Sequence, residues 1–224
     1  MSEEIGAAPP AAAATDERGI LFVISSPSGG GKGTLIKRIL PVVPRLGYSV
    51  SWTTRQPRRG EKEGVHYFFV TPEEFTRARD RGEFLEWAIV HGHYYGTSRT
   101  VVAAELAAGR DVILEIDVQG ATAVRQSGIE AVSIFILPPS YEVLRVRLIA
   151  RKSESLADLA LRLRNAREEI THYREFDYVV LNDEVERASA QLAAIVYAAR
   201  AESRRQEALA RRVLASFNEP TATA

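Results

Sequence analysis

Two hydrophobic patterns alternate along most of the chain. Short, largely apolar runs occupy residues 21–24, 111–117, 131–137 and 178–181, and such runs are typical of strands buried on both faces of a parallel sheet. Between them, apolar residues recur at helical spacing over residues 34–40, 101–108, 141–173 and 184–217. Strands that alternate with helices predict an α/β fold with a doubly wound parallel sheet, in which ligands bind at the carboxyl ends of the strands.

The middle of the chain has a different pattern. Residues 48–53 alternate between apolar and polar like a half-buried strand, and residues 65–70 are an aromatic and β-branched run. A helix is expected to begin at Pro72, with Thr71 as its cap. Residues 51–98 are therefore predicted to form a small β-rich insertion in the α/β core.

Composition limits both the architecture and the partners. The 224 residues suffice for one sizeable core, and 29 Lys and Arg residues balance 29 Asp and Glu residues. Because the formal net charge is zero, no overall field draws the protein to nucleic acid or to a membrane, and any anion binding has to be local. Neither is therefore an expected partner, and the oligomeric state is left open.

The cysteine content and the first 18 residues indicate the cellular compartment of the protein. The chain contains no cysteine, which excludes a disulfide framework and a thiolate metal site and suits a reducing compartment. Residues 1–18 are rich in Ala and Pro and carry no apolar stretch typical of a signal peptide or membrane span. We expect a flexible tail, a fold that begins at Gly19, and a cytoplasmic location.

The strongest chemical signal is the glycine-rich segment 26–34, which follows the first apolar run and leads into a helical pattern. Such a loop wraps backbone N–H groups around phosphates, and Lys32 supplies a mobile cation for the outer ones. The segment departs from the usual pattern G-x-x-x-x-G-K-[ST], because Ser26 replaces a glycine and Gly33 replaces a hydroxyl residue. The predicted phosphate-binding residues are Ser28, Gly29, Gly30, Gly31, Lys32, Gly33 and Thr34.

Acidic residues end the apolar run 111–117. A carboxylate in the position of Asp117 commonly helps to hold the magnesium that bridges the phosphates, directly or through water. The alternative is that a strand-end acid merely caps the following helix, and this alternative has more weight for Glu115 than for Asp117. Asp117 to Gly120 also match the D-x-x-G of GTP-hydrolysing switches, but residues 181–184 lack the guanine-reading Asn-Lys-x-Asp such a protein needs.

The predicted insertion contains residues that could bind a second anionic ligand. Two arginines three residues apart, Arg55 and Arg58, can clamp one phosphate together with Tyr67 and Tyr95 through charge-assisted hydrogen bonds. Glu86 offers a carboxylate that matches guanine, whose N1–H and exocyclic amine lie side by side, whereas adenine lacks this donor pair.

A succession of motifs closely resembles the guanylate kinase family from about Gly19 to the last helix, in order and with matching spacing. The motifs are Ser-Pro-Ser-Gly-x-Gly-Lys at 26–32, Ser-x-Thr-Thr-Arg-x-Pro-Arg-x-Gly-Glu at 51–61, His-Tyr-x-Phe-Val at 66–70, Phe-Leu-Glu-Trp-Ala at 84–88, Tyr-Tyr-Gly-Thr at 94–97, Leu-Glu-Ile-Asp-Val-Gln-Gly at 114–120 and Phe-Asp-Tyr-x-x-x-Asn-Asp at 176–183.

The resemblance implies transfer of a phosphoryl group from ATP, with Mg²⁺, to GMP, so that ATP and GMP are the expected small-molecule partners. It also implies a domain over residues 19–217, with a core (19–50, 99–140 and 170–217), a GMP-binding region (51–98) and a helical lid (141–169), followed by a tail (218–224). Both smaller parts are expected to close on the core when the substrates bind.

The resemblance also assigns residues. It implies that Arg55, Arg58, Tyr67 and Tyr95 hold the GMP phosphate, that Ser51, Glu86, Thr97 and Asp117 contact guanine, that Lys32 with Arg147, Arg151 and Arg162 surrounds the transferred phosphoryl group, and that Asn182 lies near the adenine. Arg164 and Arg167 are interpreted as surface charge, as is the arginine-rich last helix. The alternatives are a non-enzymatic scaffolding module, which typically lacks a working phosphate loop, and a kinase for another monophosphate.

Overall fold

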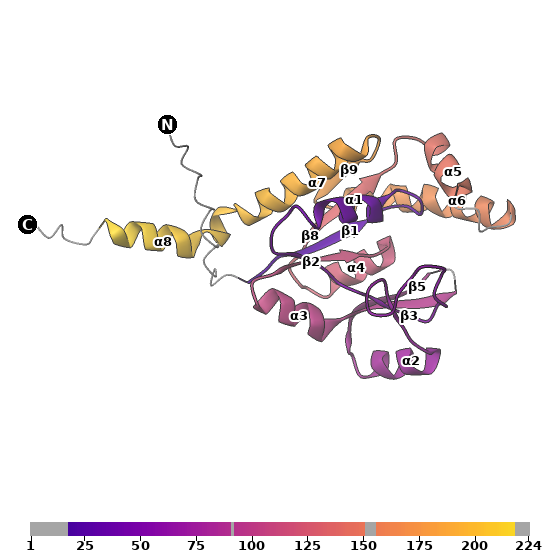
Figure 1. Ribbon diagram of the computed structural model, residues 1–224, viewed down its shortest axis with the longest axis horizontal. Coiled ribbons are helices and arrows are strands. Elements are labelled where there is room, and N and C mark those ends of the chain that lie inside the picture. The colour runs from indigo at the N-terminus through magenta and orange to yellow at the C-terminus, as the bar shows by residue number, and fades with distance from the viewer. Residues whose placement is uncertain (1–17, 91, 151–155, 218–224) are drawn as a thin grey trace, which may run out of the picture.

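A parallel sheet flanked by helices forms the core of the computed structural model, which describes residues 18–90, 92–150 and 156–217 (Figure 1). All neighbouring strands of this sheet run parallel. In spatial order they are β2 (Leu46–Tyr48), β7 (Asp111–Glu115), β1 (Leu21–Ser25), β8 (Val132–Leu137) and β9 (Tyr178–Leu181). The predicted doubly wound α/β fold is confirmed.

Alternating side chains of the buried strands build two hydrophobic layers. In β1, Phe22 and Ile24 face the layer formed with α1 (Lys32–Ile39) and α7 (Val185–Arg200). Leu21 and Val23 face the opposite layer, which holds residues of α3 (Arg99–Ala107) and α4 (Val118–Gln126). Because successive side chains point to opposite faces, an uninterrupted apolar strand is what a sheet covered on both sides requires.

A second, four-stranded sheet holds the middle of the chain. Its order is β4 (Phe68–Phe69), β3 (Trp52–Thr53), β6 (His93–Ser98) and β5 (Phe84–Val90). The helix α2 (Pro72–Asp80) begins with a capping box between Thr71 and Glu74, and its Phe75 stacks on Phe84 and Tyr94. The division of the chain into core, GMP-binding region and lid stays a prediction.

Several predicted elements differ from the structure. The strand over 48–53 is wrong because the chain passes there from the core sheet, at β2, to the second sheet, at β3. The run 65–70 contributes only β4, and Val65 is exposed. The helix over 141–173 is two α-helices and a 3-10 turn, namely α5 (Tyr141–Ile149), α6 (Leu156–Thr171) and η1 (His172–Glu175).

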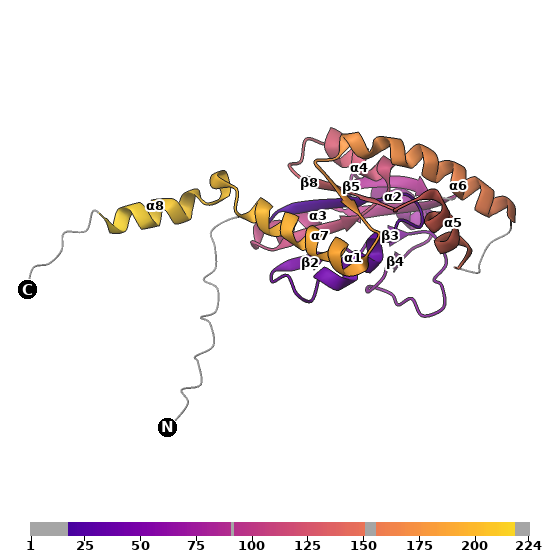
Figure 2. The same ribbon diagram turned by 90° about the horizontal axis from the view of Figure 1, so that it is seen from above.

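The last predicted helix, over 184–217, is also divided, into α7, the 3-10 turn η2 (Ser203–Arg205) and α8 (Glu207–Ser216). Long-range and local contacts favour the break: the Gln206 side chain donates to the Arg200 carbonyl, and Arg204 and Arg205 pair with Glu130. In Figure 2, α8 projects away from the body of the molecule, and none of its residues is buried.

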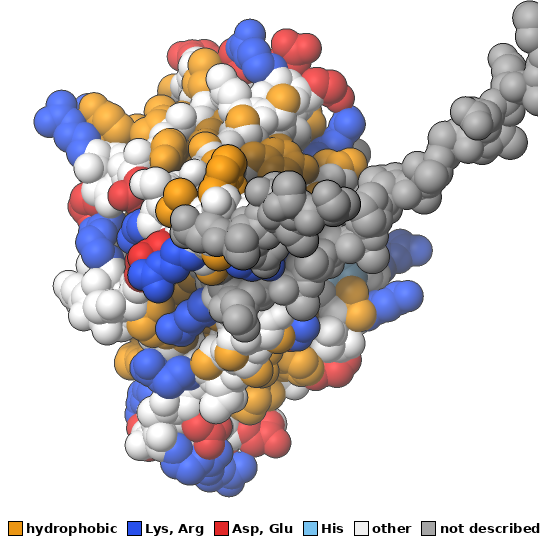
Figure 3. All heavy atoms as spheres, turned by 90° about the vertical axis from the view of Figure 1, so that its left-hand side faces the viewer, with side chains coloured by type: hydrophobic (Ala, Val, Ile, Leu, Met, Phe, Trp, Pro, Cys, Tyr) orange, Lys and Arg blue, Asp and Glu red, His pale blue; other side chains and the backbone are white. Residues whose placement is uncertain are grey.

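The surface agrees with the balanced composition. Basic and acidic side chains are both spread over the face shown in Figure 3, with hydrophobic side chains between them. Among the described residues, none of the helices has the length and apolar character needed to cross a bilayer.

A buried ion pair fastens α7 to the first residue of β7. Asp111 is 5% exposed, and its carboxylate accepts hydrogen bonds from the Ile20 backbone N–H and from Arg200 Nε, each at 2.7 Å. Arg200 Nη2 also donates to the Pro44 carbonyl at 2.7 Å. Removing one partner of such a pair leaves a buried charge uncompensated.

We expect Arg200→Met to lower the free energy of unfolding by about 3 kcal/mol, measured by urea denaturation. Arg211→Met is the matched control, because Arg211 pairs with Glu207 on the exposed helix α8. Its effect is expected to stay within about 0.5 kcal/mol. Equal effects of the two substitutions would contradict a structural role for the Asp111 pair.

Candidate active site

The phosphate loop connects β1 to α1, where the sequence places it. Gly29 and Gly31 have φ values of 85° and 90°, in the left-handed region that favours glycine. At Gly31 a Cβ atom would also lie 2.3 Å from Asn182 Nδ2. Ser26 is tolerated in place of a glycine because its φ is not positive. The loop conformation thus requires glycine where the sequence supplies it.

Two predicted site residues hold the outside of this loop. Asn182 is buried, and its Nδ2 donates to the Gly30 carbonyl at 2.8 Å. Arg147 of α5 reaches the same carbonyl with Nη1 at 3.4 Å and the Asn182 carbonyl with Nη2 at 2.9 Å. Both side chains therefore fix the loop backbone, a positioning contact that the sequence did not predict.

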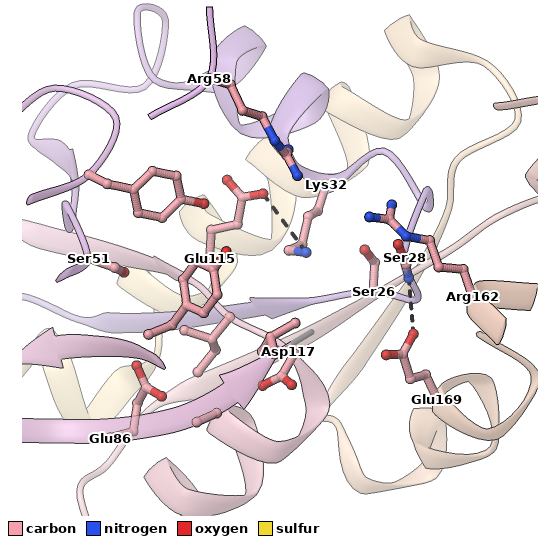
Figure 4. A pocket seen from close by; sticks show the side chains of 15 residues that line it. Ser26, Ser28, Lys32, Ser51, Arg58, Glu86, Glu115, Asp117, Arg162 and Glu169 are labelled. Carbon is pink, nitrogen blue, oxygen red and sulfur yellow. Dashed lines mark hydrogen bonds and ion pairs between the residues drawn. The ribbon is translucent and has the colours of Figure 1, made fainter. Parts of the chain in front are cut away.

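A pocket opens beside the loop and brings together side chains from both sheets and from α6 (Figure 4). The predicted site residues that line it are Ser28, Lys32, Ser51, Arg58, Tyr67, Glu86, Tyr95, Asp117 and Arg162. Lining residues without a predicted role are Ser26, Ala88, Val90, Glu115, Ile116 and Glu169. The remaining predicted residues lie behind this lining or along the loop, except Arg151, which falls outside the described residues together with the predicted tails 1–17 and 218–224.

Glu86 is a buried carboxylate at the floor of the pocket. It is 5% exposed, and its Oε1 accepts a 2.6 Å hydrogen bond from the Thr97 hydroxyl, which β5–β6 pairing places opposite. The pKa of Glu86 is raised to about 7, mainly by burial; the Thr97 hydrogen bond opposes this shift and the charge of nearby Asp117 adds to it. A Cβ atom at Gly120 would lie 2.7 Å from Glu86 Oε2, so the Glu86 carboxylate can lie against α4 in this position only because residue 120 is glycine.

Arg55 lies behind the pocket wall in a network of its own. Its Nη1 and Nη2 each donate to the Glu61 carboxylate at 3.0 Å, and its Nε donates to the Tyr95 hydroxyl at 3.2 Å. The guanidinium also lies over the Tyr67 ring, 5.4 Å from its centroid. Glu61 partly neutralises Arg55 and orients it toward Tyr95, a role that the sequence motif did not disclose.

The two acidic residues at the end of the predicted strand have different partners. Asp117 is the N-cap of α4, where its Oδ1 accepts from the Gly120 N–H at 2.9 Å. Glu115, the last residue of β7, does not cap this helix: its Oε1 lies 4.0 Å from Lys32 Nζ, and its Oε2 accepts from the Tyr48 hydroxyl at 3.2 Å. Burial raises the pKa of Tyr48, and Glu115 adds to the shift, so Tyr48 stays a donor. The capping contact is therefore present for Asp117 and not for Glu115, and the expected roles of Asp117 at magnesium and at guanine stay predictions.

Gly33 lies beside this carboxylate. A Cβ atom at Gly33 would lie 3.2 Å from Glu115 Oε1, so a larger residue there would require the Glu115 side chain to shift slightly. No group of three or more His, Asp or Glu side chains among residues 18–90, 92–150 and 156–217 could hold a metal ion. Asp117 lines the pocket with Ser28 and Lys32, and a single carboxylate beside a phosphate loop fits a Mg²⁺ ion that keeps waters and binds mainly substrate phosphates.

One side of the pocket comes from α6. Arg162 and Glu169 point from this helix toward the phosphate loop in Figure 4, and Glu169 Oε2 accepts from the Ser28 backbone N–H at 3.0 Å. Sequence reasoning missed Glu169, because nothing near residue 169 in the sequence indicates that it meets a loop 141 residues earlier.

Comparisons with known proteins identify the same family that the sequence motifs resemble. The family model described as Guanylate kinase matches residues 18–199. The guanylate kinase of Aromatoleum aromaticum is 50% identical over 182 residues, 81% of this chain and 89% of that protein, and that of Thermotoga maritima is 46% identical over 190 residues, 85% and 92% of the two chains. The crystal structure of guanylate kinase from Anaplasma phagocytophilum is similar with a TM-score of 0.69 at 36% identity, covering 84% of this chain and 90% of that one.

Proposed function

We propose roles for the side chains of the pocket from the premise that the chain belongs to the guanylate kinase family and is an ATP:GMP phosphotransferase. One observation carries the assignment: a buried carboxylate suited to guanine, Glu86, lines the same pocket as a phosphate loop with its lysine. A donor nucleotide and an acceptor nucleotide can therefore meet there.

The donor half is the loop from Ser28 to Thr34, whose N–H groups surround the ATP phosphates. Lys32 lies at the outer phosphates, and Arg162 approaches from α6. Arg147 and Asn182 also bind the loop backbone through the Gly30 carbonyl. Arg147 and Arg151 are proposed, like Arg162, to close on the ATP phosphates. Asn182 Oδ1 is buried without a hydrogen-bond partner in the described structure, which fits the proposal that Asn182 lies near the adenine and its amino group.

The acceptor half is built on the second sheet and the end of β7. We assign Glu86, Thr97, Ser51 and Asp117 to guanine, and Arg55, Arg58, Tyr67 and Tyr95 to the GMP phosphate. The pairing of Arg55 with Glu61 and Tyr95 supports this assignment, because it fixes the guanidinium beside the hydroxyl that shares the phosphate. Burial raises the pKa of Tyr67 to about 12, so its hydroxyl remains a hydrogen-bond donor.

Little covalent chemistry is needed from the protein. The attacking group is an oxygen of the GMP phosphate that is already ionised, so no general base is required, and catalysis consists of alignment, exclusion of water and stabilisation of charge on the transferred group. Mg²⁺, when bound, neutralises the ATP phosphates. Asp117 is proposed to hold it, directly or through water, and the cytoplasm is the proposed compartment.

Incubation with ATP, Mg²⁺ and one nucleoside monophosphate at a time tests the function. We expect GDP and ADP to form with GMP, and no comparable turnover with AMP, because adenine lacks the donor pair that Glu86 accepts. Comparable turnover with AMP would contradict the role of Glu86, and no turnover with GMP would contradict the proposed site as a whole.

Protonation of Glu86 predicts a pH dependence of GMP binding. Only the ionised carboxylate accepts both guanine donors, and its pKa in the free protein is about 7. The affinity for GMP is therefore expected to be constant well above pH 7 and to fall about tenfold per pH unit well below it. Calorimetry in buffers of different ionisation enthalpy should detect proton release on binding near pH 6.5.

Glu86→Gln is the control for the pH dependence of GMP affinity, because GMP itself also titrates and that contribution remains in the variant.

The ionisation of Glu86 affects folding stability in the opposite direction to GMP affinity: a rise in pH strengthens GMP binding but weakens folding. Its pKa is raised from 4.5 to about 7 by folding, so its stabilisation is full below about pH 4.5 and is lost as the pH rises through about 7. If the GMP affinities of the unsubstituted protein and of Glu86→Gln depend on pH in the same way, the assignment of Glu86 to guanine is contradicted.

A further inference from the structure

The phosphate loop is in contact with a carboxylate of the chain itself. Glu169, on α6, accepts a 3.0 Å hydrogen bond from the Ser28 backbone N–H, which belongs to the set of loop amides that the fold directs toward phosphate oxygens. In Figure 4 the Glu169 side chain extends from its helix to Ser28, while Lys32 lies farther inside the pocket. An anion is thus already present where the anionic substrate has to bind.

The surroundings of Glu169 show why it stays there. The residue is half-buried, and burial raises the pKa of its carboxyl. Lys32, His172 and the Ser28 N–H act in the other direction and favour the ionised form, while Asp117 disfavours it. The carboxylate therefore uses part of the positive potential that would otherwise stabilise an ATP phosphate.

We propose that Glu169 is an internal competitor of the ATP phosphates and latches α6 to the phosphate loop until ATP displaces it. The proposal rests on the proposed assignment of this loop to ATP. A phosphate oxygen and the carboxylate cannot share the Ser28 N–H, and two adjacent anions repel each other. ATP thus has to break the contact, and its observed affinity is lowered by the fraction of molecules in which the latch is closed.

The position of Arg162 gives the displacement a direction. Arg162 and Glu169 are seven residues apart on α6, which is two turns or about 10.5 Å along one helix face. Ala166, which lies between them on this face, is buried. Movement of α6 that withdraws the Glu169 carboxylate and retains Arg162 at the loop replaces an anion by a cation beside the arriving phosphates. Release of the latch and closure of the lid would then be one movement.

The test compares Glu169→Gln with Glu168→Gln. Both substitutions remove one negative charge from neighbouring positions of α6, but Glu168 is exposed and has no side-chain contact with the loop among the described hydrogen bonds. Calorimetric titration with the non-hydrolysable analogue AMPPNP and Mg²⁺ should give a Kd about five- to tenfold lower for Glu169→Gln, because one charge-assisted hydrogen bond no longer competes. For Glu168→Gln the change should stay within about twofold, and GMP binding should be unaffected in both.

A second measurement follows the lid itself. Since the chain contains no cysteine, spin labels can be attached uniquely at Val42→Cys beyond α1 and Leu161→Cys on α6, both of which are exposed. Without nucleotide, Glu169→Gln should shift the inter-label distance toward the value that the unsubstituted protein shows with AMPPNP.

The possible outcomes are distinct. Unchanged or weaker AMPPNP binding by Glu169→Gln would overturn the latch, whatever the labels show, and so would an unchanged distance in the empty variant. If the unsubstituted protein does not bind AMPPNP at all, the ATP assignment fails and the latch fails with it. Tighter binding that is confined to Glu169→Gln, together with the shifted distance, supports the proposal.

Discussion

Replacement of Glu86 by alanine is expected to raise the KM for GMP by about two to three orders of magnitude, while the KM for ATP changes by less than about threefold. Glu86 is buried at the far end of the pocket from the phosphate loop, and its Oε2 lies against α4 at Gly120. Without the carboxylate, the two guanine donors lose their acceptors in a site that water barely reaches, and each unpaired group costs free energy. The Thr97 hydroxyl also loses its partner. Steady-state kinetics with each substrate varied in turn measures both constants.

Glu83→Ala is the matched control, since Glu83 precedes the same strand, but its side chain is 43% exposed and pairs with Arg81. It should leave both KM values within about twofold. Urea denaturation of the Glu86 variant guards against a folding defect. Removal of a carboxyl whose ionised form is disfavoured by burial should not destabilise the protein at pH 8. A similar rise of the KM for GMP and for ATP would contradict the assignment of Glu86 to guanine.

Replacement of Lys32 by methionine is expected to lower kcat about a thousandfold. The ammonium group stabilises negative charge on the transferred phosphoryl group, and methionine keeps the length of the side chain without the charge. The structure adds a second cause. Glu115 Oε1 lies 4.0 Å from Lys32 Nζ, so the substitution also leaves a carboxylate beside the phosphates without its cation.

The second cause can be separated from the first. In the double variant Lys32→Met, Glu115→Gln the unpaired charge is absent, and we expect about a tenfold recovery of kcat over Lys32→Met alone. Lys37→Met, at an exposed position of the same helix, should stay within about twofold of the unsubstituted protein. A loss of less than tenfold in Lys32→Met would contradict a direct role of Lys32 at the transferred group. No recovery in the double variant would contradict only the contribution of Glu115.

Elements that depend on local sequence patterns were predicted correctly, and elements that depend on contacts between distant residues were not. In β1, helices cover both faces of the sheet, so the side chains of residues 21–24 are all apolar, and this pattern is visible in the sequence. The alternation of apolar and polar residues over 48–53 does not indicate where the chain leaves one sheet and enters the other. Likewise, the break between α7 and α8 depends on Arg204 and Arg205 meeting Glu130, a contact across more than seventy residues of sequence.

The same distinction holds for the candidate site. The motifs indicated Glu86 and Thr97 separately, and β5–β6 pairing joins them in a hydrogen bond. Arg55 was predicted as a phosphate ligand, but its bidentate pairing with Glu61 became visible only in the structure. For Arg147, the sequence predicted a charge at the transferred group, whereas the structure places its guanidinium on the Gly30 carbonyl.

By itself, the sequence determined the fold class, the family and the phosphate loop, and it predicted the residues that we propose to read guanine. The fold class and the loop are set by local signals: glycines that permit left-handed backbone, a lysine at fixed spacing, and apolar periodicity. The tertiary structure alone decided which charges meet. Glu115 beside Lys32 and Gly33, and Glu169 on the Ser28 N–H, join distant segments. Their energies depend on distance and burial after folding, which no spacing along the chain records.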